Sequence, residues 1–103
     1  MPPDWSLAQE YKRRVVVAFH GRVTKVVLYG SRARGDARLD SDWDIAVFMA
    51  SDPTSDDLDC LSDLGTDLLY ETGQYVQPMP IPARRFDEDS ALFRAIRSEG
   101  VPL

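Results

Sequence analysis

The segment Leu28–Phe48 constrains the fold of this chain more than any other part of its sequence. An apolar run ends at Gly30-Ser31, a charged loop follows, and a second apolar run begins with Asp42 and Asp44. Short apolar runs bounded by Gly, Ser and Asp are typical of buried strands. The connection of about a dozen residues is too short for a full helical crossover but allows one helical turn. We therefore expect two strands and a short connecting loop or turn of helix: 23–29, 42–49 and 30–38.

Asp42 and Asp44 are the residues best suited to bind a metal ion. Alternate residues of a strand point to the same face, about 6.6 Å apart along the chain. Mg²⁺ prefers oxygen ligands and keeps substrate phosphates among them, and paired ions can activate an attacking oxygen and neutralise a leaving group. We predict that Asp42 and Asp44 are catalytic metal ligands, and that Trp43 points away from them into the core or an interface. The expected faces of this strand are Asp42, Asp44, Ala46 and Phe48 on one side, and Trp43, Ile45, Val47 and Met49 on the other.

Gly30 and Ser31 form the second half of the predicted site. A glycine directly after a strand lets backbone N–H groups turn inward without a Cβ clash. Such groups, together with a serine hydroxyl, can hold phosphate oxygens. Arg32 and Arg34 follow closely, and guanidinium groups pair well with phosphates. We predict that Gly30, Ser31, Arg32 and Arg34 bind a nucleotide.

Two other phosphate or metal motifs match only in part. Gly30 and Gly35 are spaced as in a P-loop, but Asp36 stands where the lysine is required. The run from Asp40 begins like an EF-hand loop, but Ile45 replaces its turn glycine. For Asp36 and Asp40 we favour exposed loop positions without a role in binding.

The remaining segments predict a small α/β (α+β) domain. Apolar residues at helical spacing, with caps at both ends, indicate three helices, and a proline-rich apolar run indicates an edge strand. The expected order is helix, strand, turn, strand, helix, strand, helix, with a mixed sheet of about three strands flanked by helices, in one domain over residues 1–103. These elements are a helix over 6–20, a helix over 54–72, a strand over 75–81 and a helix over 87–98.

Several finer expectations concern the ends and buried faces of the helices. Ser6-Leu7-Ala8-Gln9 fits a capping box, Gly21 a C-terminal cap, and Thr54 or Ser55 an N-cap. Cys60 is expected to be packed or half-buried rather than a nucleophile. The side chains expected to face the core are Leu58, Leu61, Leu64, Leu68 and Leu69 in one helix and Leu92, Phe93 and Ile96 in the last.

Composition excludes several classes of protein. The formal net charge is −5 and the pI is near 4.7, which argues against tight binding of nucleic acid. A single cysteine excludes an internal disulfide framework. No apolar run approaches the ~20 residues of a membrane span, and residues 1–5 show no signal pattern. We therefore expect a cytoplasmic protein without a membrane association.

The combined motif resembles a known superfamily. Gly-Ser at 30–31, Gly35, and Ser-Asp-Trp-Asp-Ile at 41–45 resemble the signature of the DNA polymerase β-like nucleotidyltransferases. Within it, the short chain and the form GSRARGD…SDWD resemble the minimal nucleotidyltransferases (MNT), the antitoxin half of two-gene HEPN/MNT modules. The resemblance covers the whole chain, because the expected order of elements is that of the family.

The resemblance implies an activity and a partner. It implies that Gly30 and Ser31 bind the triphosphate and that Asp42 and Asp44 bind Mg²⁺. The reaction would transfer a nucleoside monophosphate, AMP from ATP, to a hydroxyl acceptor with release of pyrophosphate. In relatives the acceptor is a tyrosine of a HEPN toxin, a ribonuclease that this modification silences. A homo- or hetero-oligomer is compatible with it.

One departure from the superfamily opens an alternative. A third carboxylate usually comes from the next strand, but 75–81 contains no acid, and Gln77 is the expected occupant of that position. An amide cannot act as a base, and Glu71 lies at a helix end. The alternative is a catalytically weak protein that neutralises its partner by binding alone. A small-molecule transferase of the antibiotic-modifying type is a third reading, but it would need more acceptor-binding surface.

Overall fold

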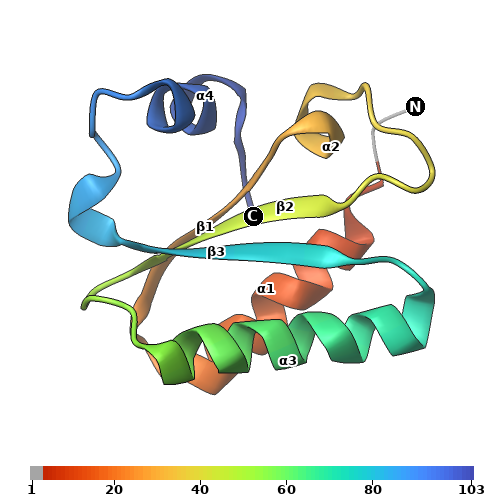
Figure 1. The fold of residues 1–103 in the computed structure, drawn as a ribbon, viewed down its shortest axis with the longest axis horizontal. Helices are drawn as coiled ribbons and strands as arrows, with labels where there is room; N and C mark the ends of the chain where they lie inside the picture. The colour runs from red at the N-terminus through yellow and green to blue at the C-terminus, as the bar shows by residue number, and fades with distance from the viewer. Residues whose placement is uncertain (1–3) are drawn as a thin grey trace.

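The computed structural model describes residues 4–103 (Figure 1). Residues 1–3, which belong to the segment 1–5 that shows no signal pattern, lie outside the described part. Four α-helices, one 3₁₀ helix and four strands alternate along this part of the chain. The helices are α1 (Ser6–Phe19), α2 (Ser31–Arg34), α3 (Ser55–Thr72), η1 (Ala83–Arg85) and α4 (Ala91–Glu99). The strands are β1 (Val23–Tyr29), β2 (Trp43–Met49), β3 (Val76–Pro82) and β4 (Val101–Pro102).

The mixed sheet has the strand order β3-β2-β1-β4. Strand β2 pairs antiparallel with β1 and parallel with β3, and β4 adds antiparallel to the outer edge of β1. The predicted α/β class and edge position of the proline-rich strand are therefore confirmed. The fourth strand was not predicted: it spans two residues after Gly100, and the backbone N–H of Leu103 extends the pairing by donating to the Val26 carbonyl at 2.9 Å.

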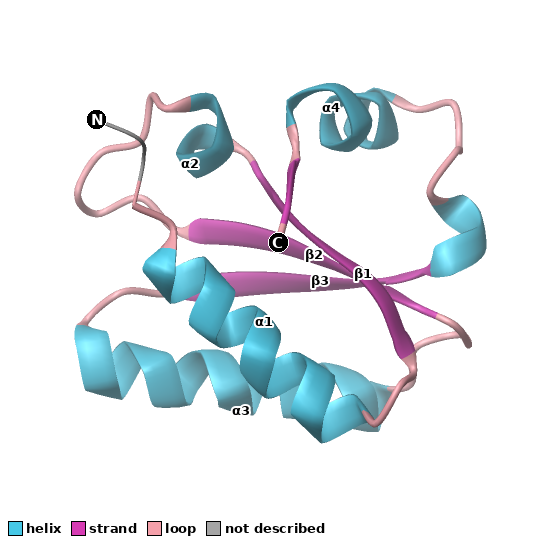
Figure 2. Cartoon of the chain, turned by 180° about the vertical axis from the view of Figure 1, so that it is seen from behind, coloured by secondary structure: helices cyan, strands magenta, loops and turns pink. Residues whose placement is uncertain are grey.

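The sheet separates two unequal helical layers. Helices α1 and α3 lie side by side against one face, and α2 and α4 lie over the other (Figures 1 and 2). Strand β2 supplies both faces as its alternation predicted, because each successive side chain of a strand changes sides. Its residues at 43, 45, 47 and 49 belong to the larger core, and those at 46 and 48 to the smaller one.

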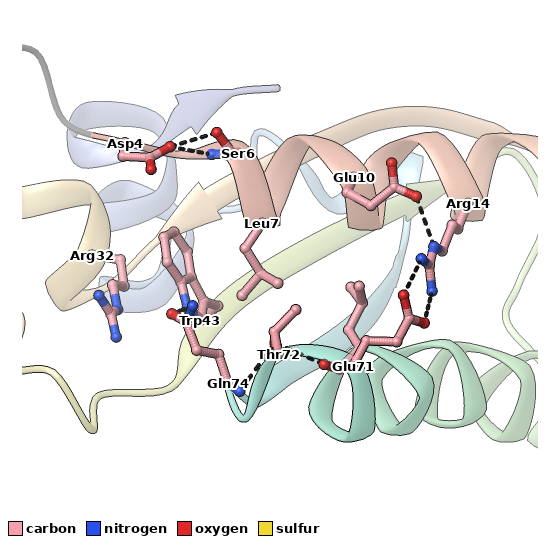
Figure 3. Close-up of a pocket in the computed structure, with 11 residues that line it drawn as sticks. Asp4, Ser6, Leu7, Glu10, Arg14, Arg32, Trp43, Glu71, Thr72 and Gln74 are labelled. Atoms are coloured by element: carbon pink, nitrogen blue, oxygen red, sulfur yellow. Dashed lines mark hydrogen bonds and ion pairs between the residues drawn. The ribbon is translucent and has the colours of Figure 1, made fainter.

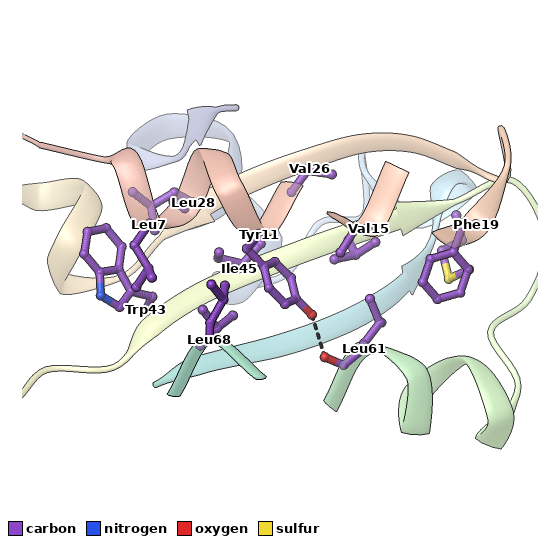
Figure 4. Packing of buried hydrophobic residues seen from close by; sticks show 14 residues of the cluster. Leu7, Tyr11, Val15, Phe19, Val26, Leu28, Trp43, Ile45, Leu61 and Leu68 are labelled. Carbon is purple, nitrogen blue, oxygen red and sulfur yellow. Dashed lines mark hydrogen bonds between the residues drawn. The ribbon is translucent and has the colours of Figure 1, made fainter. Parts of the chain in front are cut away.

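The larger core fills the space between the sheet, α1 and α3 (Figure 4). The Tyr11 hydroxyl lies within it and donates a hydrogen bond to the Leu61 carbonyl at 2.9 Å. Gly65 lets α3 approach the sheet closely, since a Cβ there would lie 3.2 Å from the Val76 carbonyl oxygen. A continuous apolar layer therefore backs β2 along its whole length.

The smaller core covers only part of the second face. Phe48 packs there against Phe93 and Ile96 of α4, and its ring meets Phe86 edge-on with centroids 5.2 Å apart. This cluster lies over the end of β2 that is distant from its first residues. The beginning of β2 on this face is therefore left outside the apolar cluster.

The predicted helices exist, but some of their ends differ. Thr54 caps α3 in a capping box with Asp57, as expected for the N-cap. The capping box predicted at Ser6 is wrong, because Ser6 is the first helical residue and its N–H and hydroxyl both donate to Asp4. At the other end of α1, His20 rather than Gly21 is the C-cap, with φ of 49°. Helix α4 begins at Ala91, later than expected, because the Ser90 hydroxyl caps it.

The predicted buried stripes were too wide. Leu61 and Leu68 are buried as expected, but Leu58 and Leu69 are exposed on α3, and so is Leu92 on α4. A helix lying flat on a sheet buries a narrow stripe, so leucines one position away from it reach solvent. Cys60 is half-buried, as predicted. Within residues 4–103, no helix is long and apolar enough to cross a membrane.

Candidate active site

The turn at Gly30 lies directly against Asp44. Gly30 has φ of 76°, and a Cβ at this position would lie 2.4 Å from Oδ2 of Asp44. The contact arises because Tyr29, the last residue of β1, pairs with Asp44 of β2. Any side chain larger than hydrogen would therefore collide with the carboxylate. The structure brings the glycine-serine turn and the aspartates together, although a short helix and a loop separate them in the sequence.

Three side chains lie abreast across the sheet at this point. Tyr29 pairs with Asp44 on one side, and Gln77 of β3 is in register with Asp44 on the other. Residues directly opposite each other on neighbouring strands project from the same face. The row therefore presents a phenol, a carboxylate and an amide on the face that also carries α2. Gln77 is exposed and occupies the position next to Asp44, where the superfamily usually has a third carboxylate.

Asp44 carries its charge in an unfavourable setting. Partial burial raises the pKa of Asp44 first, the negative charge of Asp42 raises it further, and the positive charge of Arg34 acts in the opposite direction. Asp42 is exposed and immediately precedes β2, so the strand begins one residue later than the predicted 42–49. Partial burial, followed by the charge of Asp44, raises the pKa of Tyr29 to about 12. A cation between the two carboxylates would relieve this repulsion.

Helix α2 holds Ser31 and Arg34 at the edge of the site. It is a single turn in which the N–H groups of Ala33 and Arg34 both donate to the Gly30 carbonyl at 3.1 Å. The Arg34 guanidinium pairs with Asp36 at 3.3 Å and with Glu99 of α4 at 3.5 Å. Both pairs are partly exposed, so they contribute little energy and can be exchanged for another anion. Arg34 is thus the cation that lies close enough to Asp44 to lower the pKa of its carboxyl group.

Arg32 is turned toward the opposite side. Its Nη2 donates to the Ser41 carbonyl at 2.9 Å and to the Leu39 carbonyl at 3.3 Å. Its guanidinium carbon lies 4.4 Å from the centre of the Trp43 ring, and Trp43 belongs to the larger core on the far face from Asp44. The two arginines predicted to act together are therefore separated.

A cavity of about 510 Å³ lies behind β2 (Figure 3). Asp42 and Asp44 do not line it. Arg32 and Trp43 form part of its wall, beside the start of α1 and the end of α3. Arg14 spans it, donating to Glu10 at 2.8 Å and to Glu71 at 2.7 Å. Its hydrogen bond lowers the pKa of Glu71 and commits that carboxylate to a structural pair. Glu71 is therefore not a third carboxylate of the site.

The residues at the site fit a magnesium ion that is shared with a nucleotide. Within residues 4–103, no group of three His, Cys, Asp or Glu side chains gathers to form a complete metal cage. Mg²⁺ is usually held by one or two carboxylates, with substrate phosphates and water completing its shell. The paired carboxylates of Asp42 and Asp44, beside the Gly30 contact, match that requirement.

Sequence comparison identifies the family. The profile of the family described as "Polymerase beta, Nucleotidyltransferase" matches residues 14–77, which include β1, α2, β2 and α3. The chain belongs to this nucleotidyltransferase family. No curated protein matches the sequence.

Solved structures share the fold of this nucleotidyltransferase domain. A toxin-antitoxin structure with AMP-PNP has a TM-score of 0.64 at 17% identity, covering 91% of this chain and 70% of that one. A protein assigned as a minimal nucleotidyltransferase has a TM-score of 0.58 at 26% identity, covering 95% and 93%. A complex of the tri-AMPylated Shewanella oneidensis HEPN toxin with MNT antitoxin has 0.51 at 15%, covering 91% and 69%. The predicted membership of the polymerase β-like nucleotidyltransferases is confirmed, and the fold is shared with structures that contain MNT antitoxins.

Some neighbours of the site were not foreseen. The sequence predicts Tyr29 only as a strand residue. Its position before Gly30 and its pairing with Asp44 place it in the candidate site. Glu99 could not be linked to Arg34, because the link depends on how α4 packs over the sheet. The glycine-serine turn and the aspartate pair were visible in the sequence because both follow strict spacing at strand ends.

Proposed function

We propose that this nucleotidyltransferase domain transfers AMP from ATP to a tyrosine hydroxyl of a HEPN toxin and thereby acts as an antitoxin. The observation that carries the proposal is the contact of Gly30 with Asp44, with Asp42 one alternate position away. This arrangement has no structural benefit, since burial and a like charge both disfavour the Asp44 carboxylate. Similarity to toxin-antitoxin structures, including one with an AMPylated HEPN toxin, supports this choice of partner.

The roles of the residues follow from their positions. Asp42 and Asp44 hold Mg²⁺, which when bound neutralises phosphate charge during the transfer. Gly30 and Ser31 hold the triphosphate against them, and Arg34 exchanges Asp36 and Glu99 for phosphate oxygens. The acceptor oxygen bonds to the α-phosphorus as the bond to the pyrophosphate oxygen breaks. Pyrophosphate leaves, and the proton of the acceptor passes to water.

Gln77 favours a second candidate function, neutralisation by binding. Its amide lies beside Asp44, where a carboxylate would deprotonate the acceptor. Loss of a general base typically costs about 10²–10⁴-fold in rate. A domain this slow could still silence a toxin by covering it. The two candidates share a fold and a partner and differ only in chemical transfer.

A labelling experiment separates these functions. The purified protein is incubated with ATP radiolabelled at the α-phosphate, Mg²⁺ and the product of the neighbouring gene. The key variant is Asp42→Asn/Asp44→Asn, and its matched control is Asp56→Asn/Asp59→Asn, which removes the same charge from the exposed side of α3. We expect the wild type and the control to label the partner and the key variant to leave it unlabelled.

Either other result would redirect the assignment. If no protein labels the partner while all of them bind it equally, the binding-only function is correct. If the key variant labels the partner as well as wild type does, the aspartates are not the site and the proposal is wrong. Gel filtration of each mixture supplies the binding measurement.

A further inference from the structure

Arg32 makes an unusual set of contacts for an arginine on a phosphate-binding turn. One nitrogen of its guanidinium donates to two carbonyls of the loop before β2, those of Leu39 and Ser41, at 3.3 and 2.9 Å. The guanidinium carbon of the same group lies over the Trp43 ring, 4.4 Å from its centre. Arg32 therefore joins α2, the loop and the first residue of β2 into one unit.

Trp43 is a rigid base for this stack. Its side chain is 4% exposed, and its Nε1 donates to the Gln74 side-chain oxygen at 2.9 Å. Its backbone N–H donates to the Tyr75 carbonyl at the same distance. Trp43 is thus fixed at both its ring and its backbone, so a group stacked on it is fixed as well.

Among residues 4–103, the loop before β2 makes few other hydrogen bonds to the rest of the domain. Ser41 bonds back to Arg38 through its N–H at 3.1 Å and accepts from the Arg38 N–H at 2.8 Å, which closes a local turn without reaching the rest of the domain. Leu39 is 98% exposed. The Arg32 hydrogen bonds are therefore a main connection between this loop and the body of the domain.

We infer that Arg32 is a positioning residue that sets the location of Asp42, and that it does not contact the nucleotide. Asp42 directly follows Ser41, so fixing the Ser41 carbonyl fixes the peptide plane that leads into the metal-binding carboxylate. The planar guanidinium can donate within its plane and stack with its face at the same time, which a lysine ammonium cannot do. The role of Arg32 in positioning a metal ligand rests on the proposed function, whereas its contacts with the loop do not.

The partly buried position of Arg32 agrees with a clamp. Its Nε atom is buried and has no hydrogen-bond partner within residues 4–103. Leaving a donor unpaired in this way is unfavourable, so the packing on Trp43 and the carbonyl bonds must hold the side chain in place. An arginine serving as a phosphate contact would instead keep its donors toward the open face, as Arg34 does.

The clamp is tested first without metal or nucleotide. Amide hydrogen exchange is measured for residues 39–43 in wild type, Arg32→Met, Arg32→Lys and the matched control Arg34→Met from the same helical turn. We expect both Arg32 variants to speed exchange by about tenfold, since methionine loses the charged hydrogen bonds and lysine cannot hold the carbonyls while stacking on Trp43. Arg34→Met should match wild type. Circular dichroism confirms that each variant is folded, and the lysine variant keeps the test valid if the methionine variant unfolds.

The consequence for Asp42 is tested by titrating Mn²⁺ and following its electron paramagnetic resonance signal. Loss of a group that orients a metal ligand typically weakens binding by about 10–100-fold, and we expect this for both Arg32 variants. Arg94→Met, which removes an exposed arginine paired with Asp89, is the control and should bind Mn²⁺ like wild type.

The results separate the inference from the proposed function. Unchanged loop exchange and Mn²⁺ affinity in Arg32→Met, with ATP binding weakened as in Arg34→Met, would overturn the inference and make Arg32 a triphosphate contact. A wild-type protein that bound no Mn²⁺ would contradict the proposed function. The exchange rates alone would then decide whether Arg32 holds the loop.

Discussion

The two faces of the sheet differ in how completely they are covered, although β2 contributes to both. On the face under α1 and α3, Ile45, Val47 and Met49 are fully buried. On the other face, α4 covers Phe48 but leaves Asp44 beside an open turn. The closed face provides most of the apolar burial, and the incompletely covered half of the open face carries the candidate site. The charge of the candidate site is thus placed on a strand that is anchored from behind.

The comparison also explains why the site is small but well ordered. Tyr29, Asp44 and Gln77 are paired in one row across three adjacent strands, and Gly30 directly follows Tyr29, so backbone pairing fixes their spacing. Asp42 lies in the loop before β2, and the Arg32 contact is proposed to restrain it. Separate changes on the two faces should therefore have different consequences for activity and stability.

The largest effect is expected from Asp44→Asn. Transfer of label should fall by about 10²–10³-fold, as typically follows the loss of one preorganised electrostatic group. The free energy of unfolding at pH 7 should not decrease, because burial and Asp42 raise the pKa of Asp44 and so make its charged form unfavourable in the folded state. Urea unfolding and the labelling assay measure both quantities. A variant that lost activity only because it had unfolded would refute the assignment of Asp44.

Gly30→Ala should damage the site while leaving both aspartates in place. The new Cβ would meet Asp44 Oδ2 at 2.4 Å and would also require a left-handed backbone at a non-glycine residue. A misplacement of about 1 Å can cost on the order of 10²-fold in rate, and we expect a loss of that size. Gly35→Ala is the matched control, since it has a similar φ of 84° but no atom within 4 Å of its Cβ position. Equal transfer rates in the two variants would exclude the contact as the cause.

Leu61→Ala tests the closed face. Leu61 is fully buried between α3 and the sheet, and such truncations cost roughly 2–5 kcal/mol of unfolding free energy. Leu58→Ala on the same helix is the control, since Leu58 is 44% exposed and its truncation should cost far less. Below its unfolding transition, Leu61→Ala should transfer label at the wild-type rate. A large fall in the rate for folded protein would mean that the two faces are coupled.

Asp57→Asn should reveal the smallest and most pH-dependent effect. Hydrogen bonds from Arg22 and then from the Thr54 backbone lower the pKa of Asp57 to about 2. Its stabilisation is therefore complete above the ordinary pKa near 4 and is lost as the pH falls toward 2. At pH 7 we expect a loss of about 2 kcal/mol, typical of charged hydrogen bonds, measured by urea unfolding. A difference that stayed constant from pH 7 to pH 2 would contradict this account.

The elements of the fold that rest on a pattern over several residues could be predicted from the sequence. The alternation in β2 and the N-cap at Thr54 act locally, so they identified the elements correctly. Strand β4 could not be predicted because two residues have no periodicity, and it contains Pro102. The exposure of Leu58 depends on the orientation of α3 against the sheet, which the local sequence does not specify.

The site shows the same limit. Gly30 and Asp44 follow motif spacing, and Gln77 could be placed by assuming adjacent strands. The direction of a long side chain cannot be predicted in this way, because Arg32 and Arg34 are the same residue type and lie on one turn of helix. Only packing shows that Arg32 stacks on Trp43 while Arg34 reaches Glu99.

The central claim is that a metal-bound nucleotide occupies the open half of the second face, and paramagnetic broadening of amide resonances tests it most directly. Substoichiometric Mn²⁺ is added to isotopically labelled protein in the presence of AMP-PNP. The account predicts selective loss of the signals of Gly30, Ser31, Asp42, Asp44 and Gln77, while α1 and α3 stay sharp. Broadening centred instead on the acidic exposed residues of α3, or none at all, would contradict it.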